Sequence, residues 1–233
     1  MTDLDFDSFV LAAATDDLGE EPAAREHADA VEFRLDLATD PLEQLAGYDG
    51  ELPLIVTNRA DWEGGEADDE AERLDALESA LGHDRVAAVD IECAALDGSA
   101  DAADAERARE LRENARENGV SVIASVHDFA STPPVDELTA RLDRAADEGD
   151  VGKLAVTAAD RDDALAVLTA THRAVSAGRT VATMAMGEAG RHTRAVAPVY
   201  GSAIGYAPVD PASATAPGQY DLVTLRGLVD QLQ

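Results

Sequence analysis

The sequence contains a single lysine, Lys153, which lies in the apolar stretch VGKLAV (residues 151–156), and its other seventeen Lys+Arg residues are all arginine. Arginine stays protonated in proteins, so it cannot provide the neutral amine that attacks a carbonyl carbon. Lysine can do so where burial or a neighbouring cation favours loss of its proton. The alternative is a partly buried lysine that extends to solvent. Because every other basic residue of the two types is arginine, the single lysine favours the first interpretation, an amine that forms an imine.

His127 is the candidate acid–base partner of this amine. It ends the apolar stretch VSVIASVH (residues 120–127), and an imidazole titrates near neutral pH, as a general acid or base requires. Alone, it could equally be a loop histidine with local hydrogen bonds. No HxH, HxxxH or carboxylate cluster has the spacing of a metal site, so the sequence predicts no metal.

Short apolar runs that alternate with amphipathic segments must position these side chains. Eight runs read as strands, and between them apolar residues recur at helical spacing, as in Leu74, Leu77 and Leu81. This alternation is typical of a parallel sheet covered by helices, and eight such units predict one (β/α)8 barrel domain over residues 1–233. An open doubly wound sheet is the alternative, but no GxGxxG follows the first run. The expected strands cover residues 9–14, 30–37, 52–58, 85–92, 120–127, 151–157, 179–186 and 201–207.

Active sites of such barrels lie at the carboxyl ends of the strands, and the chemically unusual residues fall there. Glu32 and Arg34 alternate along one strand, so both point inward if Phe33 packs against the helices; a charged pair inside a barrel is costly unless it binds something polar. Arg59 ends the next strand, and Glu63 follows before a Gly-Gly pair that serves either a tight turn or a close ligand approach. Other polar or sulfur-containing side chains near strand ends are Asp90, Glu92, Met184 and Met186.

The formal net charge is −30, and acidic residues occur in every expected helix. We interpret this as an acidic surface adapted to high intracellular salt, which screens like-charge repulsion. Such a surface argues against binding nucleic acid or anionic lipid. The sequence begins without a signal peptide, and no apolar stretch approaches the length of a membrane span, which predicts a cytoplasmic protein without membrane association. The single cysteine, Cys93, excludes an internal disulfide.

The motifs EFRLD, TNRADWEGG, VIASVHDF, GKLAV, MAMGEAGRHTR, GSA and ATAPGQ, taken together and in this order, resemble the type I 3-dehydroquinate dehydratase family over essentially the whole chain. The resemblance implies a (β/α)8 barrel, a homodimer, and dehydration of 3-dehydroquinate to 3-dehydroshikimate in the shikimate pathway through a Schiff base, without a cofactor. It implies Lys153 as the imine-forming residue, His127 as the base and Glu63 as the carboxylate that orients it. The implied substrate-binding residues are Glu32, Arg34, Arg59, Arg194, Thr215 and Gln219.

The sequence departs from the family pattern at a few positions. Thr193 and Thr215 stand where serine is more frequent, and both keep a hydroxyl; Asn58 replaces an aromatic residue. Two rival functions stay open on the sequence: another imine-forming barrel enzyme such as a class I aldolase, and an acidic barrel that only binds a ligand or a basic protein. The arginine set suits a carboxylated polyol better than an aldolase substrate, and only the binding protein would keep its function after Lys153→Arg.

Overall fold

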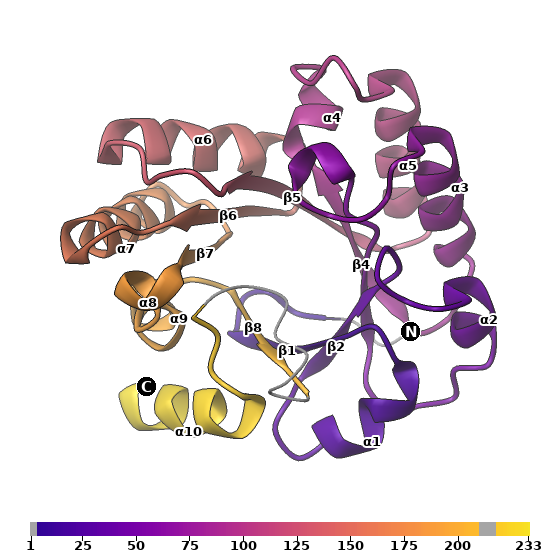
Figure 1. Ribbon diagram of the computed structural model, residues 1–233, viewed down its shortest axis with the longest axis horizontal. Coiled ribbons are helices and arrows are strands. Elements are labelled where there is room, and N and C mark those ends of the chain that lie inside the picture. The colour runs from indigo at the N-terminus through magenta and orange to yellow at the C-terminus, as the bar shows by residue number, and fades with distance from the viewer. Residues whose placement is uncertain (1–3, 210–217) are drawn as a thin grey trace.

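Eight parallel strands form a nearly closed barrel with helices around it in the computed structural model, which describes residues 4–209 and 218–233 (Figure 1). This arrangement confirms the predicted (β/α)8 fold. The strands are β1 Val10–Thr15, β2 Ala30–Arg34, β3 Leu54–Thr57, β4 Val86–Glu92, β5 Ser121–Asp128, β6 Val151–Thr157, β7 Val181–Met186 and β8 Ile204–Pro208. The expected run 151–157 matches β6 at both ends, whereas the runs from residues 30, 52, 179 and 201 begin or end up to three residues outside their strands.

Neighbouring strands pair in the order β7-β6-β5-β4-β3-β2-β1-β8, so consecutive strands lie side by side around the barrel. The register places Ser125 beside Lys153 and Ala14 beside Glu32. Between β7 and β8 the described residues form a single parallel bridge, Val181 with Ser202, with a hydrogen bond from Ala203 N to Val181 O of 2.7 Å. In the described residues, the β7–β8 seam that closes the barrel therefore has fewer hydrogen bonds than the other neighbouring strand pairs.

Helices follow the strands and cover the outside of the barrel (Figure 1). The long ones, α3, α5, α6, α7 and α10, pack buried leucine, valine and alanine side chains onto the sheet. Leu232 is exposed because it lies at the final turn of the last helix. The helices are α1 Glu21–Ala24, α2 Pro41–Ala46, α3 Glu70–Ala80, α4 Cys93–Asp97, α5 Ala105–Glu117, α6 Val135–Glu148, α7 Arg161–Ser176, α8 Gly187–Gly190, α9 Thr193–Val196 and α10 Leu222–Leu232, with 3-10 turns at Leu18–Glu20 (η1), Asp61–Glu63 (η2) and Ala197–Tyr200 (η3).

The inside of the barrel changes from apolar to polar along the strands. Near the amino ends, side chains such as Ile55, Ile123 and Val151 form one apolar cluster, which the partly buried Leu4 and Phe6 join. Two or four residues further along each strand the side chains again point inward, because strand side chains alternate. At this level they are mostly polar: Glu32, Thr57, Arg59, Asp90, Glu92, Ser125, His127 and Lys153. The apolar cluster thus forms the floor of a polar pocket.

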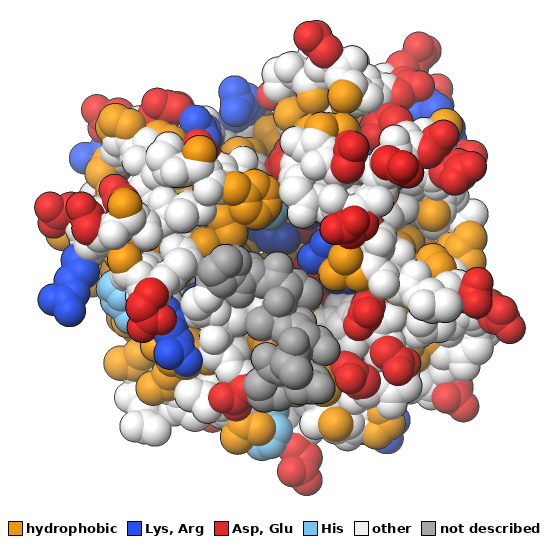
Figure 2. Space-filling view, viewed as in Figure 1, with side chains coloured by type: hydrophobic (Ala, Val, Ile, Leu, Met, Phe, Trp, Pro, Cys, Tyr) orange, Lys and Arg blue, Asp and Glu red, His pale blue; other side chains and the backbone are white. Residues whose placement is uncertain are grey.

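Carboxylates are spread over the surface in view, and the central hollow shows lysine and arginine side chains with few carboxylates, while other basic side chains lie around the periphery (Figure 2). The chain carries 48 Asp+Glu against 18 Lys+Arg, so the hollow differs in charge from its surroundings. An anionic ligand is repelled by most of this surface and attracted by its centre. In the part of the chain that the structure describes, we find no helix with the length and apolar character of a membrane span.

Candidate active site

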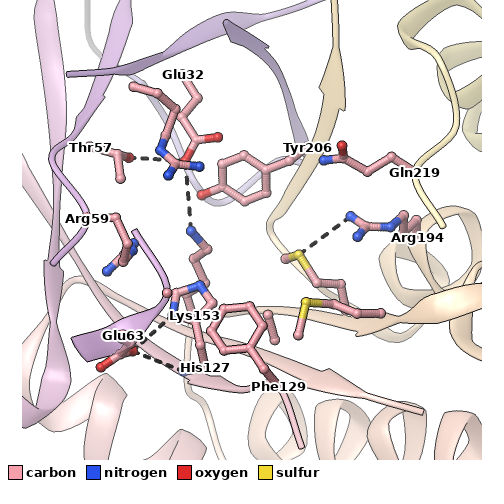
Figure 3. A pocket seen from close by; sticks show the side chains of 15 residues that line it. Glu32, Thr57, Arg59, Glu63, His127, Phe129, Lys153, Arg194, Tyr206 and Gln219 are labelled. Atoms are coloured by element: carbon pink, nitrogen blue, oxygen red, sulfur yellow. Dashed lines mark hydrogen bonds and ion pairs between the residues drawn. The ribbon is translucent and has the colours of Figure 1, made fainter. Parts of the chain in front are cut away.

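Lys153 lies on β6 in the middle of the barrel, and its side chain rises into the pocket (Figure 3). Only 5% of the residue is exposed. Its Nζ donates to Oδ2 of Asp90 at 2.8 Å, lies 3.9 Å from Oε1 of Glu32, and sits 4.5 Å from the ring centroid of Tyr206. The amine is thus fixed by a buried carboxylate and shielded by an aromatic ring, with open space in front of it.

The carboxylate that binds this amine belongs to a network of buried ion pairs. Arg59 donates from Nη2 to Asp90 at 2.6 Å and from Nη1 to Glu92 at 2.9 Å, and Glu92 also accepts from Arg73 at 2.7 Å. All four side chains are almost fully buried. Burial would raise the pKa of Asp90, but the cations of Arg59 and Lys153 outweigh it and hold that pKa below its usual range. Asp90 therefore stays ionised beside the amine.

The sequence left open whether Asp90 and Glu92 are functional or structural. Asp90 contacts Lys153 directly, whereas Glu92 bridges two arginines and accepts from the backbone N–H of Ala60 at 3.0 Å. Asn58, the departure from the family pattern, donates to the backbone oxygen of Arg73 at 3.1 Å and so holds α3 against the strand end. Glu92 and Asn58 thus connect the pocket to its supporting helix.

His127 lies on β5 and is held by Glu63. Oε1 of Glu63 accepts two hydrogen bonds from His127, one from the ring Nδ1 at 2.9 Å and one from the backbone N–H at 3.0 Å. Nδ1 then carries a hydrogen, which leaves Nε2 as the free base. Burial, together with the nearby cations Arg59 and Lys153, lowers the pKa of His127 well below its usual value, and burial raises the pKa of Glu63 to about 8. The imidazole is therefore neutral at neutral pH, as a proton acceptor must be.

Glu63 reaches this position because of the Gly-Gly pair that follows it. Gly64 has a φ of 81°, in the left-handed region that favours glycine, and a Cβ on Gly65 would lie 2.1 Å from the backbone oxygen of Arg59. The loop closes through hydrogen bonds from Gly65 N to Ala60 O at 2.9 Å and from Asp61 N to Ala67 O at 2.9 Å. The pair therefore serves the tight turn, and Gly64 also lines the pocket.

Glu32 and Arg34 both line the pocket from β2, while Phe33 is buried on the helix side, as the alternation predicts. Oε1 of Glu32 accepts from Thr57 Oγ1 at 3.0 Å. Arg34 is held by Asp36 through two hydrogen bonds, of 2.9 and 2.6 Å, so its guanidinium is pre-positioned. These residues present both donors and acceptors to a ligand with several hydroxyl groups.

Arg194 enters the pocket from α9, on the side opposite Glu32 (Figure 3). It is 4% exposed, its Nη1 lies 3.8 Å from the sulfur of Met184, and its Nε and Nη2 have no hydrogen-bond partner among the described residues. Burial lowers its pKa to about 10. Thr193 fixes the short helix, since its hydroxyl donates to Gly190 O at 2.7 Å and accepts from Ala185 N at 2.9 Å. An unpaired buried guanidinium is suited to a carboxylate.

The structure thus brings together Lys153, His127, Glu63, Glu32, Arg34, Arg59, Arg194 and Gln219 around one pocket. Thr215 lies outside the described residues. Met184 and Met186, left open on the sequence, line the pocket wall. In residues 4–209 and 218–233, no group of three or more His, Cys, Asp or Glu side chains is arranged to hold a metal ion.

Two aromatic lining residues were missed by the sequence reasoning. Phe129, 52% exposed, stacks on the His127 ring at 5.8 Å between centroids, and Tyr206 covers Lys153. Tyr206 could have been found, since it lies two residues after the inward-facing Ile204 on β8. Phe129 follows the end of β5, where strand alternation gives no guide.

The fold and the pocket define a class: (β/α)8-barrel enzymes with a lysine amine and a histidine at the carboxyl ends of the strands. The family described as Type I 3-dehydroquinase matches residues 10–233. The chain belongs to this family and is therefore a hydro-lyase.

Named relatives agree with this family. The chain is 62% identical over 230 residues to the 3-dehydroquinate dehydratase of Haloarcula marismortui, covering 99% of both chains. It is 54% identical over 232 residues to that of Halobacterium salinarum, covering 99% of this chain and 100% of the other. The crystal structure of 3-dehydroquinate dehydratase from Geobacillus kaustophilus HTA426 superposes with a TM-score of 0.83 at 29% identity, covering 97% of this chain and 91% of that one.

Proposed function

We propose that the chain dehydrates 3-dehydroquinate to 3-dehydroshikimate through a Schiff base on Lys153, in the shikimate pathway of aromatic amino acid biosynthesis. The observation that carries the proposal is the position of the Lys153 amine, which faces the same pocket as the His127–Glu63 pair and the guanidinium of Arg194. Two nitrogens of this guanidinium have no hydrogen-bond partner among the described residues. Nucleophile, base and anion-binding group are separate side chains, so each can act on a different part of one small substrate.

Imine formation is the first stage. Lys153 gives a proton to His127, and its neutral Nζ attacks the ketone carbon to form a carbinolamine. His127 returns this proton to the carbinolamine oxygen, which leaves as water, and a protonated imine remains. Asp90 and the ring of Tyr206 keep the amine aimed at the pocket. The positive nitrogen then withdraws electrons from the neighbouring carbon and makes its hydrogen more acidic.

Elimination is the second stage. His127 takes the proton from this neighbouring carbon, the C–H electrons form an enamine, and the enamine expels the hydroxyl of the next carbon. His127 gives its proton to the departing oxygen, so water leaves in a syn elimination. Hydrolysis of the conjugated imine consumes one water, releases 3-dehydroshikimate and restores the lysine. The neutral state of His127 and its fixed tautomer suit it to both transfers.

Substrate binding divides between two sides of the pocket. Arg194 clamps the carboxylate with its free donors, and Glu32, Arg34 and Arg59 face the hydroxyls. Gln219 closes the pocket together with Thr215, which the structure does not describe, as part of a loop that excludes water.

Trapping with borohydride tests this function, and the single lysine makes the outcome unambiguous. Enzyme mixed with 3-dehydroquinate and reduced should gain one adduct, which peptide mass spectrometry places on Lys153. Lys153→Arg keeps a cation for Asp90 and should fold, yet should form neither the adduct nor the enone product that is followed by absorbance. Assays in high KCl prevent unfolding from being mistaken for inactivity. Turnover by Lys153→Arg, or an adduct with sugar phosphates in place of dehydroquinate, would refute the mechanism.

We further propose a cytoplasmic homodimer that works at high salt without nucleic acid, membrane or cofactor partners. The family resemblance supports the dimer, and Val199, which is 52% exposed, is an apolar surface side chain of the kind that interfaces cover. The net charge of −30 and the haloarchaeal relatives support the salt adaptation. Light scattering after size exclusion in high KCl tests the dimer, and a monomeric mass would contradict it.

A further inference from the structure

The hydroxyl of Tyr206 is a buried polar group that the mechanism above does not use. The residue is 4% exposed, and its hydroxyl has no hydrogen-bond partner among the described residues. A buried hydroxyl without a partner costs free energy in the empty enzyme, whereas a phenylalanine of the same shape does not. The position therefore calls for a ligand that supplies the missing partner.

The ring orientation shows which part of a ligand the hydroxyl meets. Tyr206 extends from β8 over Lys153, with Nζ 4.5 Å from the ring centroid, and its hydroxyl end points toward Glu32, away from the side of Arg194 and Gln219 (Figure 3). Burial, with the carboxylates of Glu32 and Asp90, raises the pKa of Tyr206 well above its usual value. The phenol thus keeps its hydrogen and is available as a donor.

The proposed function supplies the orientation of the substrate, and the inference rests on it. The ketone carbon of 3-dehydroquinate lies at Nζ of Lys153. In one direction its ring leads through the methylene carbon to the carboxylate-bearing carbon, which belongs on the side of Arg194. In the other direction the next carbon bears a hydroxyl. With the carboxylate toward Arg194, that hydroxyl faces Glu32 and the phenol.

We propose that Tyr206 is a further substrate-binding residue, whose phenol donates a hydrogen bond to the substrate hydroxyl next to the ketone. The same hydroxyl donates in turn to the carboxylate of Glu32, whose Oε1 already accepts from Thr57. The Tyr206 hydroxyl, which has no partner among the described residues, then gains one from this substrate hydroxyl. Sites built in this way reject analogues that lack the matching hydroxyl, because their own buried polar groups stay unpaired. Tyr206 therefore contributes to selectivity for the vicinal hydroxy-ketone.

Tyr206→Phe tests the proposal, because it removes the hydroxyl and keeps the ring over Lys153. The two substrates are 3-dehydroquinate and its 4-deoxy analogue, and the matched control is Tyr200→Phe, which removes an exposed phenol. We expect kcat/KM of Tyr206→Phe for 3-dehydroquinate to fall roughly ten-fold, while on the 4-deoxy analogue variant and wild type agree within about two-fold. Tyr200→Phe should match the wild type on both.

Two readouts separate this role from a structural one. The melting temperature of the ligand-free Tyr206→Phe variant should equal or exceed that of the wild type, because the unpaired hydroxyl is gone. Equal losses on both substrates, or unchanged kcat/KM on 3-dehydroquinate, would overturn the inference. Borohydride trapping is run on the same preparations: if the wild type forms the Lys153 adduct while Tyr206→Phe loses no activity, the inference fails and the proposed function stands. Absence of the adduct in the wild type refutes both.

Discussion

Arg194→Met should make the empty protein more stable and the enzyme much less active. The guanidinium is buried, two of its nitrogens have no hydrogen-bond partner among the described residues, and burial lowers its pKa to about 10. This lowering corresponds to about 3 kcal/mol by which the fold disfavours the charged form. The cost is fully present below the folded pKa, at pH 7 for example, and declines as the pH rises above about 10. Methionine removes this charge, and we expect a gain of about 1–3 kcal/mol in the free energy of unfolding.

The same substitution removes two charge-assisted hydrogen bonds to the substrate carboxylate. At about 1.5–3 kcal/mol each, and allowing for incomplete additivity, their loss amounts to about 3 kcal/mol or a roughly hundred-fold lower kcat/KM. Urea unfolding and enone formation, both at one fixed KCl concentration, measure the two effects. Arg194→Lys is the control, since it keeps the charge and loses the planar fork. A variant that is less stable than the wild type and keeps kcat/KM within about three-fold would refute the assignment of Arg194.

Three further outcomes follow from the buried charges and from the surface. Glu92→Gln leaves Arg59 and Arg73 without their shared carboxylate, so the free energy of unfolding measured in urea should fall by about 3 kcal/mol. The control Asp75→Asn, in an exposed ion pair, should lower it by less than about 1 kcal/mol. Similar losses in the two variants would contradict the buried network. Because the pKa of His127 is lowered, its ring stays neutral between pH 7.5 and 6, and kcat/KM should stay within about two-fold over this range. An activity midpoint near 6.5 would count against a buried neutral ring. The melting temperature should rise between about 0.1 and 2 M KCl as the surface charge of −30 is screened, and a melt that does not respond to salt would remove the case for halophilic adaptation.

The sequence predicted the barrel and most of the pocket because both depend on local pattern. Eight apolar runs and strand alternation suffice to place Glu32, Arg34 and Lys153 on the inner face. The contrast between one lysine and seventeen arginines selects the amine without any structure. The roles of Glu63 and Arg194 came from the family resemblance, since neither strand alternation nor composition indicates what a loop residue will contact.

The contacts within the pocket could not be predicted, because they join residues far apart in the chain. Arg59 was expected to bind substrate, yet its donors also hold Asp90, Glu92 and Ser125, which lie 31, 33 and 66 residues away. Alternation places these side chains on one face but does not say which of them pair. The unpaired hydroxyl of Tyr206 likewise becomes visible only when all its neighbours are in place.

The seam between β7 and β8 is also one wall of the pocket. Its described residues form the Val181–Ser202 bridge, a hydrogen bond from Ala203 N to Val181 O and one from Thr183 N to the Ser202 hydroxyl, where other strand pairs form continuous ladders. Local opening requires the least free energy where the fewest bonds must break. Met184 and Tyr206 lie on the two strands of this seam and line the pocket, so the pocket borders the strand pair whose separation would break the fewest hydrogen bonds.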